Sequence, residues 1–233
     1  MKTIGLLGGM SWESTIPYYR IINETVKSRL GGLHSAKIVL HSVDFHDIEQ
    51  LQHAGKWEEV GKVLAEAAAS LERAGAELLV ICTNTMHKVA PMIERVLSIP
   101  LLHIADATAA AIIKSKISTV GLLGTRFTME EDFYVDRLRT KHGLNVLIPD
   151  EPDRIEIHRV IYDELCLGQI VDKSRKEYYQ IIERLRVSGA QGIILGCTEI
   201  PMLVDPRHVA IPTFDTTRLH AEFAAFQSLA GNA

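Results

Sequence analysis

Residues 3–10 read TIGLLGGM and residues 119–126 read TVGLLGTR, in each case an apolar strand that runs into a glycine-containing turn. The two stretches are 119 − 3 = 116 residues apart. A second pair, AGAELLVI at 74–81 and SGAQGIIL at 188–195, has the pattern of a helix end, a glycine stop and a buried strand, at an offset of 189 − 75 = 114. Two signals in the same order at nearly the same displacement predict two related halves.

The regions between these signals alternate apolar strands with amphipathic helical stretches. We expect helices at 57–73, 105–115, 130–142, 174–188 and 216–229, the last of them returning to pack on the first half. Such alternation is typical of parallel sheets flanked by helices. The sequence therefore predicts an α/β fold of two pseudo-symmetric Rossmann-like domains, with the active site in the cleft between them. The expected domains are residues 1–112 with 211–233, and residues 113–210.

The composition excludes several classes of protein. With 25 Lys and Arg against 29 Asp and Glu, the net charge is −4, and no basic cluster is present to bind a nucleic acid. No apolar run approaches the roughly 18 residues of a membrane span. Three cysteines without paired spacing argue against a disulfide framework and favour a cytoplasmic location. The histidines are scattered and lack metal-ligand spacing, so we expect no metal site.

The turns that follow the strands are where chemistry is expected, because open α/β sheets bind ligands at the carboxyl ends of their strands. Cys197 follows a buried strand, and Pro201 suits the first turn of a helix. We expect the Cys197 thiol to lie near a helix N-terminus. The partial positive charge there would lower its pKa and make it a competent base or nucleophile.

The repeat also identifies the counterpart of Cys197 in the first half. Because 197 − 114 = 83, the equivalent position is Thr83, whereas Cys82 matches Gly196. Side chains alternate across a strand, so Cys82 is expected to point away from the face that Thr83 occupies. A buried, inert thiol is the favoured interpretation of Cys82 and of Cys166.

Three motifs carry a family resemblance: TIGLLGGMSWEST at 3–15, TNTMH at 83–87 and GCTEIP at 196–201. Together they resemble the aspartate/glutamate racemase family over nearly the whole chain. The resemblance implies an amino-acid racemase that needs no cofactor and is often a homodimer. It also implies one thiol on each face of the substrate α-carbon, one removing the α-proton and the other returning a proton.

The sequence departs from this pattern at one position, because the family's first motif is Cys-Asn-Thr and here it begins with Thr83. An alkoxide is far harder to form near neutral pH than a thiolate, so Thr83 is a poor general base but can still donate a proton. The resemblance implies that Cys197 deprotonates L-substrates. We therefore predict L-selective turnover, with L-aspartate and L-glutamate as the first candidates.

The α-carboxylate of such a substrate needs hydrogen-bond donors. Asn84, Thr85 and Thr198 offer side-chain donors and the backbone N–H groups of helix starts. The same residue types also serve as ordinary helix caps, and that alternative stays open. The resemblance implies that Met10 and Thr125 line the substrate pocket.

Roles for Glu199 and His87 are open as well. Each follows a proposed proton-transfer position, by two and by four residues, and could orient the site or be a solvated polar residue.

The side chain of the substrate is less well defined. Relatives specific for aspartate usually have an arginine after the second strand and a lysine before a glycine in the second half. The stretches 42–48 and 163–168 contain neither, and Gln52 is the nearby polar residue we assign to substrate binding. Either a cation such as Arg20 or Arg126 reaches the pocket, or the enzyme accepts neutral side chains.

Two other classes of function remain. A single-cysteine decarboxylase of the same superfamily would also need only the second-half thiol, and release of CO₂ from a malonate would identify it. A binding module with two α/β lobes would hold an amino acid unchanged, with Cys197 as an incidental thiol.

Overall fold

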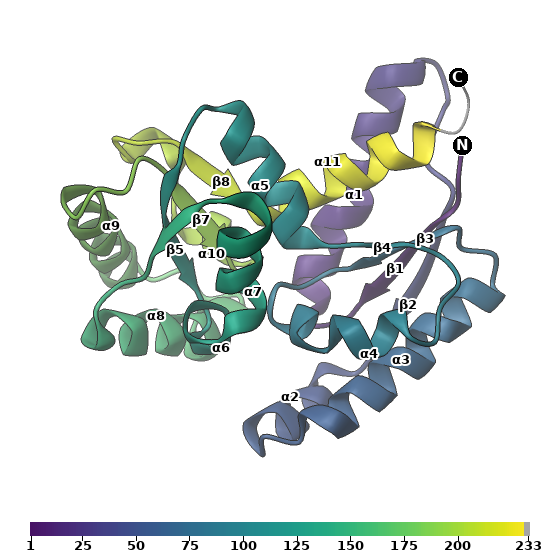
Figure 1. The fold of residues 1–233 in the computed structure, drawn as a ribbon, viewed down its shortest axis with the longest axis horizontal. Coiled ribbons are helices and arrows are strands. Elements are labelled where there is room, and N and C mark those ends of the chain that lie inside the picture. Colours follow the sequence, from purple (N-terminus) through teal and green to yellow (C-terminus); the bar gives the residue numbers. More distant parts are fainter. Residues whose placement is uncertain (231–233) are drawn as a thin grey trace. The chain divides into compact units, whose positions relative to one another are not determined.

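The computed structural model describes residues 1–230, which form two compact units (Figure 1). Of the described residues, the first unit contains 1–103 and 220–230, and the second contains Ile104–Leu219. The expected boundaries, after 112 and before 211, each differ from these by nine residues. Residues 104–112 and 211–219 go with the second unit because helix α5 (Ile104–Lys114) packs in its core and strand β8 (Thr213–Asp215) extends its sheet.

Each unit is built on a four-stranded parallel sheet. The first has the order β2-β1-β3-β4, from β1 (Ile4–Gly8), β2 (Ile38–Ser42), β3 (Leu78–Ile81) and β4 (Leu101–Leu102). The second has the order β6-β5-β7-β8, from β5 (Thr119–Gly124), β6 (Asn145–Leu147), β7 (Ile193–Gly196) and β8. The two orders are the same when counted from the start of each half. The predicted α/β class with two related halves is confirmed.

In the first unit, apolar side chains of β1 alternate between two cores. Ile4 and Leu6 pack on one face and Leu7 on the other, as the period of a strand requires. The helical elements are α1 (Trp12–Leu30), α2 (Phe45–His53), α3 (Trp57–Arg73), η1 (Thr85–Val89), α4 (Ala90–Glu94) and α11 (Thr216–Leu229). Ala221 and Ala224 of α11 lie in the same cluster as Ile4, so the C-terminal helix packs on the first half as predicted.

The second unit has one continuous core around β5 and β7. Its further helical elements are α6 (Arg126–Glu130), α7 (Asp132–Asp136), η2 (Arg137–Lys141), α8 (Glu151–Asp163), η3 (Leu165–Leu167), α9 (Asp172–Val187), α10 (Ile200–Leu203) and η4 (Pro206–His208). The single helix expected at 130–142 is wrong. Glu131 has an extended backbone (φ −98°, ψ 149°), which separates α6 from α7.

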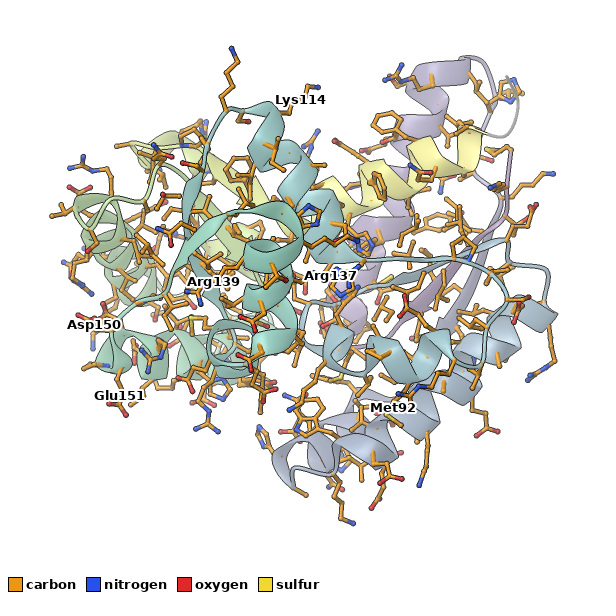
Figure 2. The ribbon with its side chains drawn as sticks, in the orientation of Figure 1. Met92, Lys114, Arg137, Arg139, Asp150 and Glu151 are labelled. Atoms are coloured by element: carbon orange, nitrogen blue, oxygen red, sulfur yellow. The ribbon has the colours of Figure 1, made fainter. Side chains whose placement is uncertain are left out.

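The segment η2 is fixed to α5 by an ion pair. Arg137, labelled in Figure 2, donates through Nε and Nη2 to the two carboxylate oxygens of Asp106, each at 2.8 Å. Lys141 and His142 contact the same carboxylate, and together these groups hold the pKa of Asp106 well below its usual range although burial opposes the shift. These contacts tie η2 and the residue after it to α5.

Strands β1 and β5 both end in glycine where the following helix comes close. A Cβ on Gly8 would lie 2.5 Å from Thr15 Cγ2, and one on Gly124 would lie 3.1 Å from Thr128 Cβ. A side chain at either position would push the next turn away from the sheet. Within residues 1–230, no helix combines the length and hydropathy that a membrane span needs.

Candidate functional site

The first group of predicted site residues lies at the carboxyl ends of β1 and β3. These neighbouring strands mark the point where the strand order reverses, the place where doubly wound sheets bind ligands. Thr83, Asn84 and Thr85 are 8%, 3% and 6% exposed. The Ser14 hydroxyl lies within hydrogen-bonding distance of the carbonyl oxygens of Ser11 (2.8 Å) and Cys82 (3.4 Å). It therefore ties the turn after β1 to the turn after β3.

Two further predicted residues flank this turn in the first unit. Met10 is buried, in the same cluster as Ile48 of α2 and Met86 of η1. Gln52 is also buried and follows Ile48 by four residues, which places both on one face of α2. Asn84 stands at the N-cap position of η1 without making a side-chain capping hydrogen bond, so the simple cap interpretation does not describe it.

The second group lies at the equivalent place in the second unit, at the carboxyl ends of β5 and β7. Gly124 pairs with Gly196, so Thr125 and Cys197 follow at adjacent strand ends. Thr125 is a helix cap: its hydroxyl accepts from the backbone N–H of Thr128 at 3.3 Å. Cys197 is 8% exposed and Thr198 is 9% exposed.

The strand register supports the equivalence of Thr83 and Cys197. Leu7 pairs with Ile81 in the first sheet, and Leu123 pairs with Leu195 in the second. Since Leu7 and Leu123 are related by the offset of 116, Ile81 corresponds to Leu195. Two residues later the chain reaches Thr83 in one unit and Cys197 in the other.

Cys82 occupies the core instead. Its side chain is fully buried in the cluster that contains Tyr18 and Ile22, and burial raises the pKa of its thiol.

A carboxylate lies directly against the Cys197 thiol. Cys197 Sγ donates to Glu199 Oε2 at 2.9 Å, and the Thr198 hydroxyl donates to the same oxygen at 2.6 Å. Burial first, and then the Glu199 charge, raise the pKa of Cys197 well above its ordinary value. The lowered pKa expected from a helix N-terminus is therefore wrong, because burial and the Glu199 charge both act against it and α10 has only four residues.

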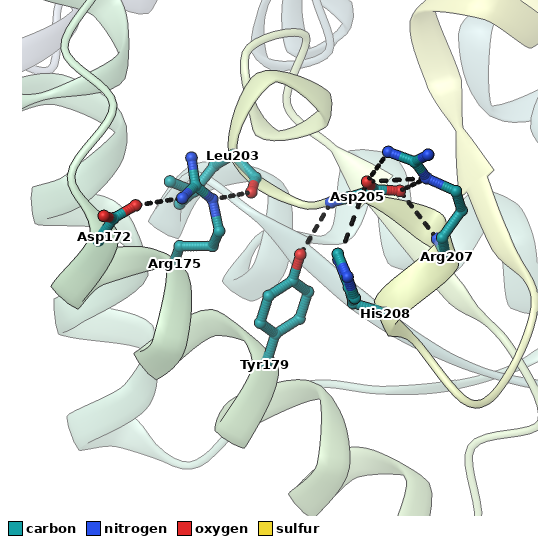
Figure 3. A network of polar contacts seen from close by, with 7 residues as sticks. All are labelled: Asp172, Arg175, Tyr179, Leu203, Asp205, Arg207 and His208. Carbon is teal, nitrogen blue, oxygen red and sulfur yellow. Dashed lines mark hydrogen bonds and ion pairs between the residues drawn. The ribbon is translucent and has the colours of Figure 1, made fainter.

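Two side chains of α9 form hydrogen bonds with the backbone of the segment that follows the Cys197 turn (Figure 3). Arg175 donates through Nε to the carbonyl oxygen of Leu203 at 3.1 Å and also pairs with Asp172. The backbone N–H of Asp205 donates to the Tyr179 hydroxyl at 3.1 Å. Both contacts hold the C-terminal end of α10, the short helix that follows the turn carrying Cys197 and Glu199.

The two cations suggested for a substrate carboxylate differ in their surroundings. Arg20 lies 3.9 Å from Glu24 on the outer surface of α1, and both side chains are 67% exposed. Arg126 directly follows Thr125 at the end of β5, and its backbone N–H donates to His158 Nδ1 at 3.2 Å. Arg126 is exposed as well, with its guanidinium 5.8 Å from the centre of the Phe127 ring, but it adjoins the predicted site residue Thr125 in the chain.

The sequence analysis left the roles of Glu199 and His87 open. In the structure, Glu199 contacts the Cys197 thiol and His87 contacts the Thr83 backbone. The two-residue spacing of Cys197 and Glu199 was the available signal for the first contact. His87 Nδ1 lies 2.8 Å from the carbonyl oxygen of Thr83. Because side-chain bonds to a backbone carbonyl depend on local geometry, residue order alone gave no signal for the second.

Comparison with known proteins adds an independent finding. The family model described as Asp/Glu/Hydantoin racemase matches residues 7–224. A candidate Asp/Glu racemase from Yersinia pestis is 58% identical, with a TM-score of 0.92 over 98% of this chain and 100% of that chain. An aspartate racemase homologue from Pyrococcus horikoshii OT3 is 33% identical, with a TM-score of 0.84 over 98% and 100% of the two chains.

A curated relative has a lower sequence identity to this chain. A glutamate racemase from Staphylococcus carnosus is 26% identical over 196 residues, covering 78% of this chain and 71% of its own length.

Proposed function

The chain belongs to the Asp/Glu/Hydantoin racemase family, and from this premise we propose that it is a cofactor-independent amino-acid racemase acting on L-amino acids through Cys197. The observation that carries the proposal is the contact between the Cys197 thiol and the Glu199 carboxylate at the carboxyl edge of the second sheet. This is the geometry of a thiol with a proton acceptor at hydrogen-bonding distance.

The first step is proton removal from the substrate. Glu199 accepts the thiol proton, and the resulting thiolate takes the proton from the α-carbon, leaving the electron pair delocalised into the α-carboxylate. Once Glu199 is protonated, its charge no longer opposes the thiolate. The raised pKa of Cys197 is therefore compatible with a base that forms only as the proton moves to Glu199.

The second step returns a proton to the other face of the α-carbon. We assign this step to the Thr83 hydroxyl, or to a water that it positions, because Thr83 occupies the register position of Cys197 in the first unit. Thr83 then regains a proton from solvent while Glu199 releases the proton that it took from Cys197. Because the two enantiomers have equal free energy, inversion must have the same kcat/KM from either side. The preference for L-substrates that we propose is therefore a preference in α-proton exchange, since a hydroxyl is a poor base for the D-form near neutral pH.

The developing negative charge needs donors that are in place before the reaction. We assign the α-carboxylate to Asn84, Thr85, Thr125 and Thr198, the last through its backbone N–H because its hydroxyl already donates to Glu199. Preorganised donors of this kind are worth about 3–4 kcal/mol each in a buried site. Met10 and Gln52, both buried in the first unit, would form the wall of the pocket.

We propose L-aspartate and L-glutamate as the preferred substrates, with Arg126 as the cation for the side-chain carboxylate. The printed descriptions of the relatives, an aspartate racemase homologue and a glutamate racemase, support an acidic substrate. The alternative, a racemase of neutral amino acids, would leave Arg126 without a role in catalysis.

A single-cysteine decarboxylase is the second candidate, because of the two equivalent positions, Thr83 and Cys197, only the second carries a thiol. Incubation of the purified protein with L- and D-forms of aspartate, glutamate, alanine and serine, without added cofactor, followed by chiral chromatography, distinguishes the possibilities. Appearance of the opposite enantiomer from L-aspartate or L-glutamate is the expected result. Unchanged amino acids together with CO₂ release from an arylmalonate would identify the decarboxylase, and ligand recovered unchanged in every case would favour a binding protein.

A further inference from the structure

Three buried histidines from distant parts of the chain meet next to the Thr83 turn in the first unit. His87, His103 and His220 are 1%, 6% and 0% exposed. The ring centroid of His87 lies 4.4 Å from that of His103 and 5.8 Å from that of His220. Among residues 1–230, no group of three or more His, Cys, Asp or Glu side chains is arranged to hold a metal ion. The cluster therefore calls for a different explanation.

Hydrogen bonds define the proton positions in this cluster. A carbonyl oxygen only accepts, so the 2.8 Å contact of His87 Nδ1 with Thr83 O requires a proton on Nδ1. In the same way, His220 donates through Nε2 to the carbonyl oxygen of Leu102 at 2.7 Å. The Tyr18 hydroxyl lies 2.9 Å from His220 Nδ1. His220 is thus fixed on both sides and in turn packs against the His87 ring.

The charge state of His87 follows from the same neighbours. Burial, and then the adjacent His103 and His220, lower the pKa of His87 well below its ordinary value. A neutral imidazole with its proton on Nδ1 is one defined tautomer, and that N–H donates to the Thr83 carbonyl.

The second unit has no counterpart of this contact. Applying the offset gives 87 + 114 = 201, which is Pro201, a residue without a side-chain donor. The Cys197 turn is held by hydrogen bonds to Glu199 instead, and Glu199 matches Thr85. The Thr83 turn, whose hydroxyl is the weaker acid–base group, is therefore the one whose backbone is bound by a buried histidine.

We propose that His87 is a positioning residue for the Thr83 face of the reaction: its Nδ1–H holds the Thr83 carbonyl and so fixes the hydroxyl that returns the proton. The bond goes to the carbonyl and not to the hydroxyl, so His87 acts through Thr83 and does not itself exchange a proton with substrate. This inference rests on the proposed function. It predicts that loss of the His87 bond impairs proton return more than proton removal.

The test measures both half-reactions in one sample. With L-aspartate in D₂O, deuterium in recovered L-aspartate reports proton removal and return on the Cys197 face, whereas D-aspartate reports return on the Thr83 face. His87→Asn keeps an amide N–H near the place of Nδ1–H, and His87→Gln moves it toward the place of Nε2. We expect H87Q to lower the ratio of inversion to exchange by about tenfold. H87N should keep that ratio within about threefold.

A matched control is His41→Gln, because His41 lies on β2 and contacts Ser70. It should leave the ratio unchanged. If H87Q lowers exchange and inversion in proportion, or if H87N lowers the ratio as much as H87Q does, the positioning role is overturned.

A second measurement does not depend on the variants folding. Nitrogen-15 NMR of histidine-labelled wild-type protein should show His87 as a neutral ring with its proton on Nδ1, and a proton on Nε2 alone would overturn the inference. If the wild-type protein exchanges and inverts no amino acid, the proposed function fails, while the NMR result still decides whether the hydrogen bond exists.

Discussion

The Thr83 turn and the Cys197 turn are equivalent in fold and different in chemistry. Both follow the third strand of their sheet, in the same register, and both key side chains are 8% exposed. One turn presents a hydroxyl with a neutral histidine on its carbonyl, and the other presents a thiol against a carboxylate. A repeated fold can therefore place two unequal groups at equivalent positions, and a few side chains make the difference.

The largest expected effect comes from removing the thiol. Cys197→Ala should lower turnover of L-substrates by about 10³-fold or more, because no other group in the proposal removes the α-proton. Steady-state kinetics with L-aspartate and L-glutamate measure it. The matched control is Cys82→Ala, which removes a core thiol on the neighbouring residue of the Thr83 turn. It should cost about 1 kcal/mol of unfolding free energy and change turnover less than about threefold. Equal loss in both variants would mean that the register argument is wrong.

Neutralising the acceptor of the thiol proton should have the next largest effect. Glu199→Gln should lower kcat by about 100-fold at neutral pH, since the amide cannot take the proton. The same change should lower the pKa of Cys197, because the Glu199 charge is one of the causes that raise it. The pH dependence of alkylation by iodoacetamide measures that shift. Faster alkylation accompanied by higher activity would mean that Glu199 only repels the thiolate.

Making the two turns alike tests the comparison directly. Thr83→Cys places a thiol at both register positions and should raise the rate of α-proton exchange of D-aspartate by about tenfold or more. Thr83→Ser keeps a hydroxyl and should keep the faster exchange of the L-form. NMR of each pure enantiomer in D₂O at early times measures both exchange rates. If the wild type exchanges the α-protons of the D- and L-forms at similar rates, the assignment of one face to each of these two residues is wrong.

The smallest effect concerns recognition of the substrate side chain. Arg126→Ala should raise KM for L-aspartate and L-glutamate by about tenfold with a smaller change in kcat, because the guanidinium binds a group that does not react. Arg20→Ala is the matched control, as its side chain is exposed beside Glu24. A KM unchanged in R126A would remove the reason for proposing an acidic substrate.

Much of the fold followed from the repeat and the apolar periodicity. The helices at 57–73 and 216–229 begin and end where the pattern predicts them. The helix at 130–142 failed because periodicity cannot show that Glu131 takes an extended backbone. The observed boundaries between the units differ from the expected ones because β8 pairs with β7 of the second unit. Such pairing between distant segments leaves no signal in local periodicity.

At the candidate site, the positions were predictable and the interactions were not. Thr83 and Cys197 followed from arithmetic on the repeat, whereas the raised pKa of Cys197 depends on burial and on where the Glu199 carboxylate points. The homodimer and the cytoplasmic location stay predictions of the sequence.

The most direct test of the central claim is α-proton exchange in D₂O, followed by NMR without added cofactor, for separate L- and D-forms of aspartate and glutamate. The account predicts that the L-forms exchange much faster than the D-forms in the wild type, and that Cys197→Ala abolishes this exchange. Absence of exchange from every amino acid, or exchange from L-forms that survives in the Cys197→Ala variant, would contradict it.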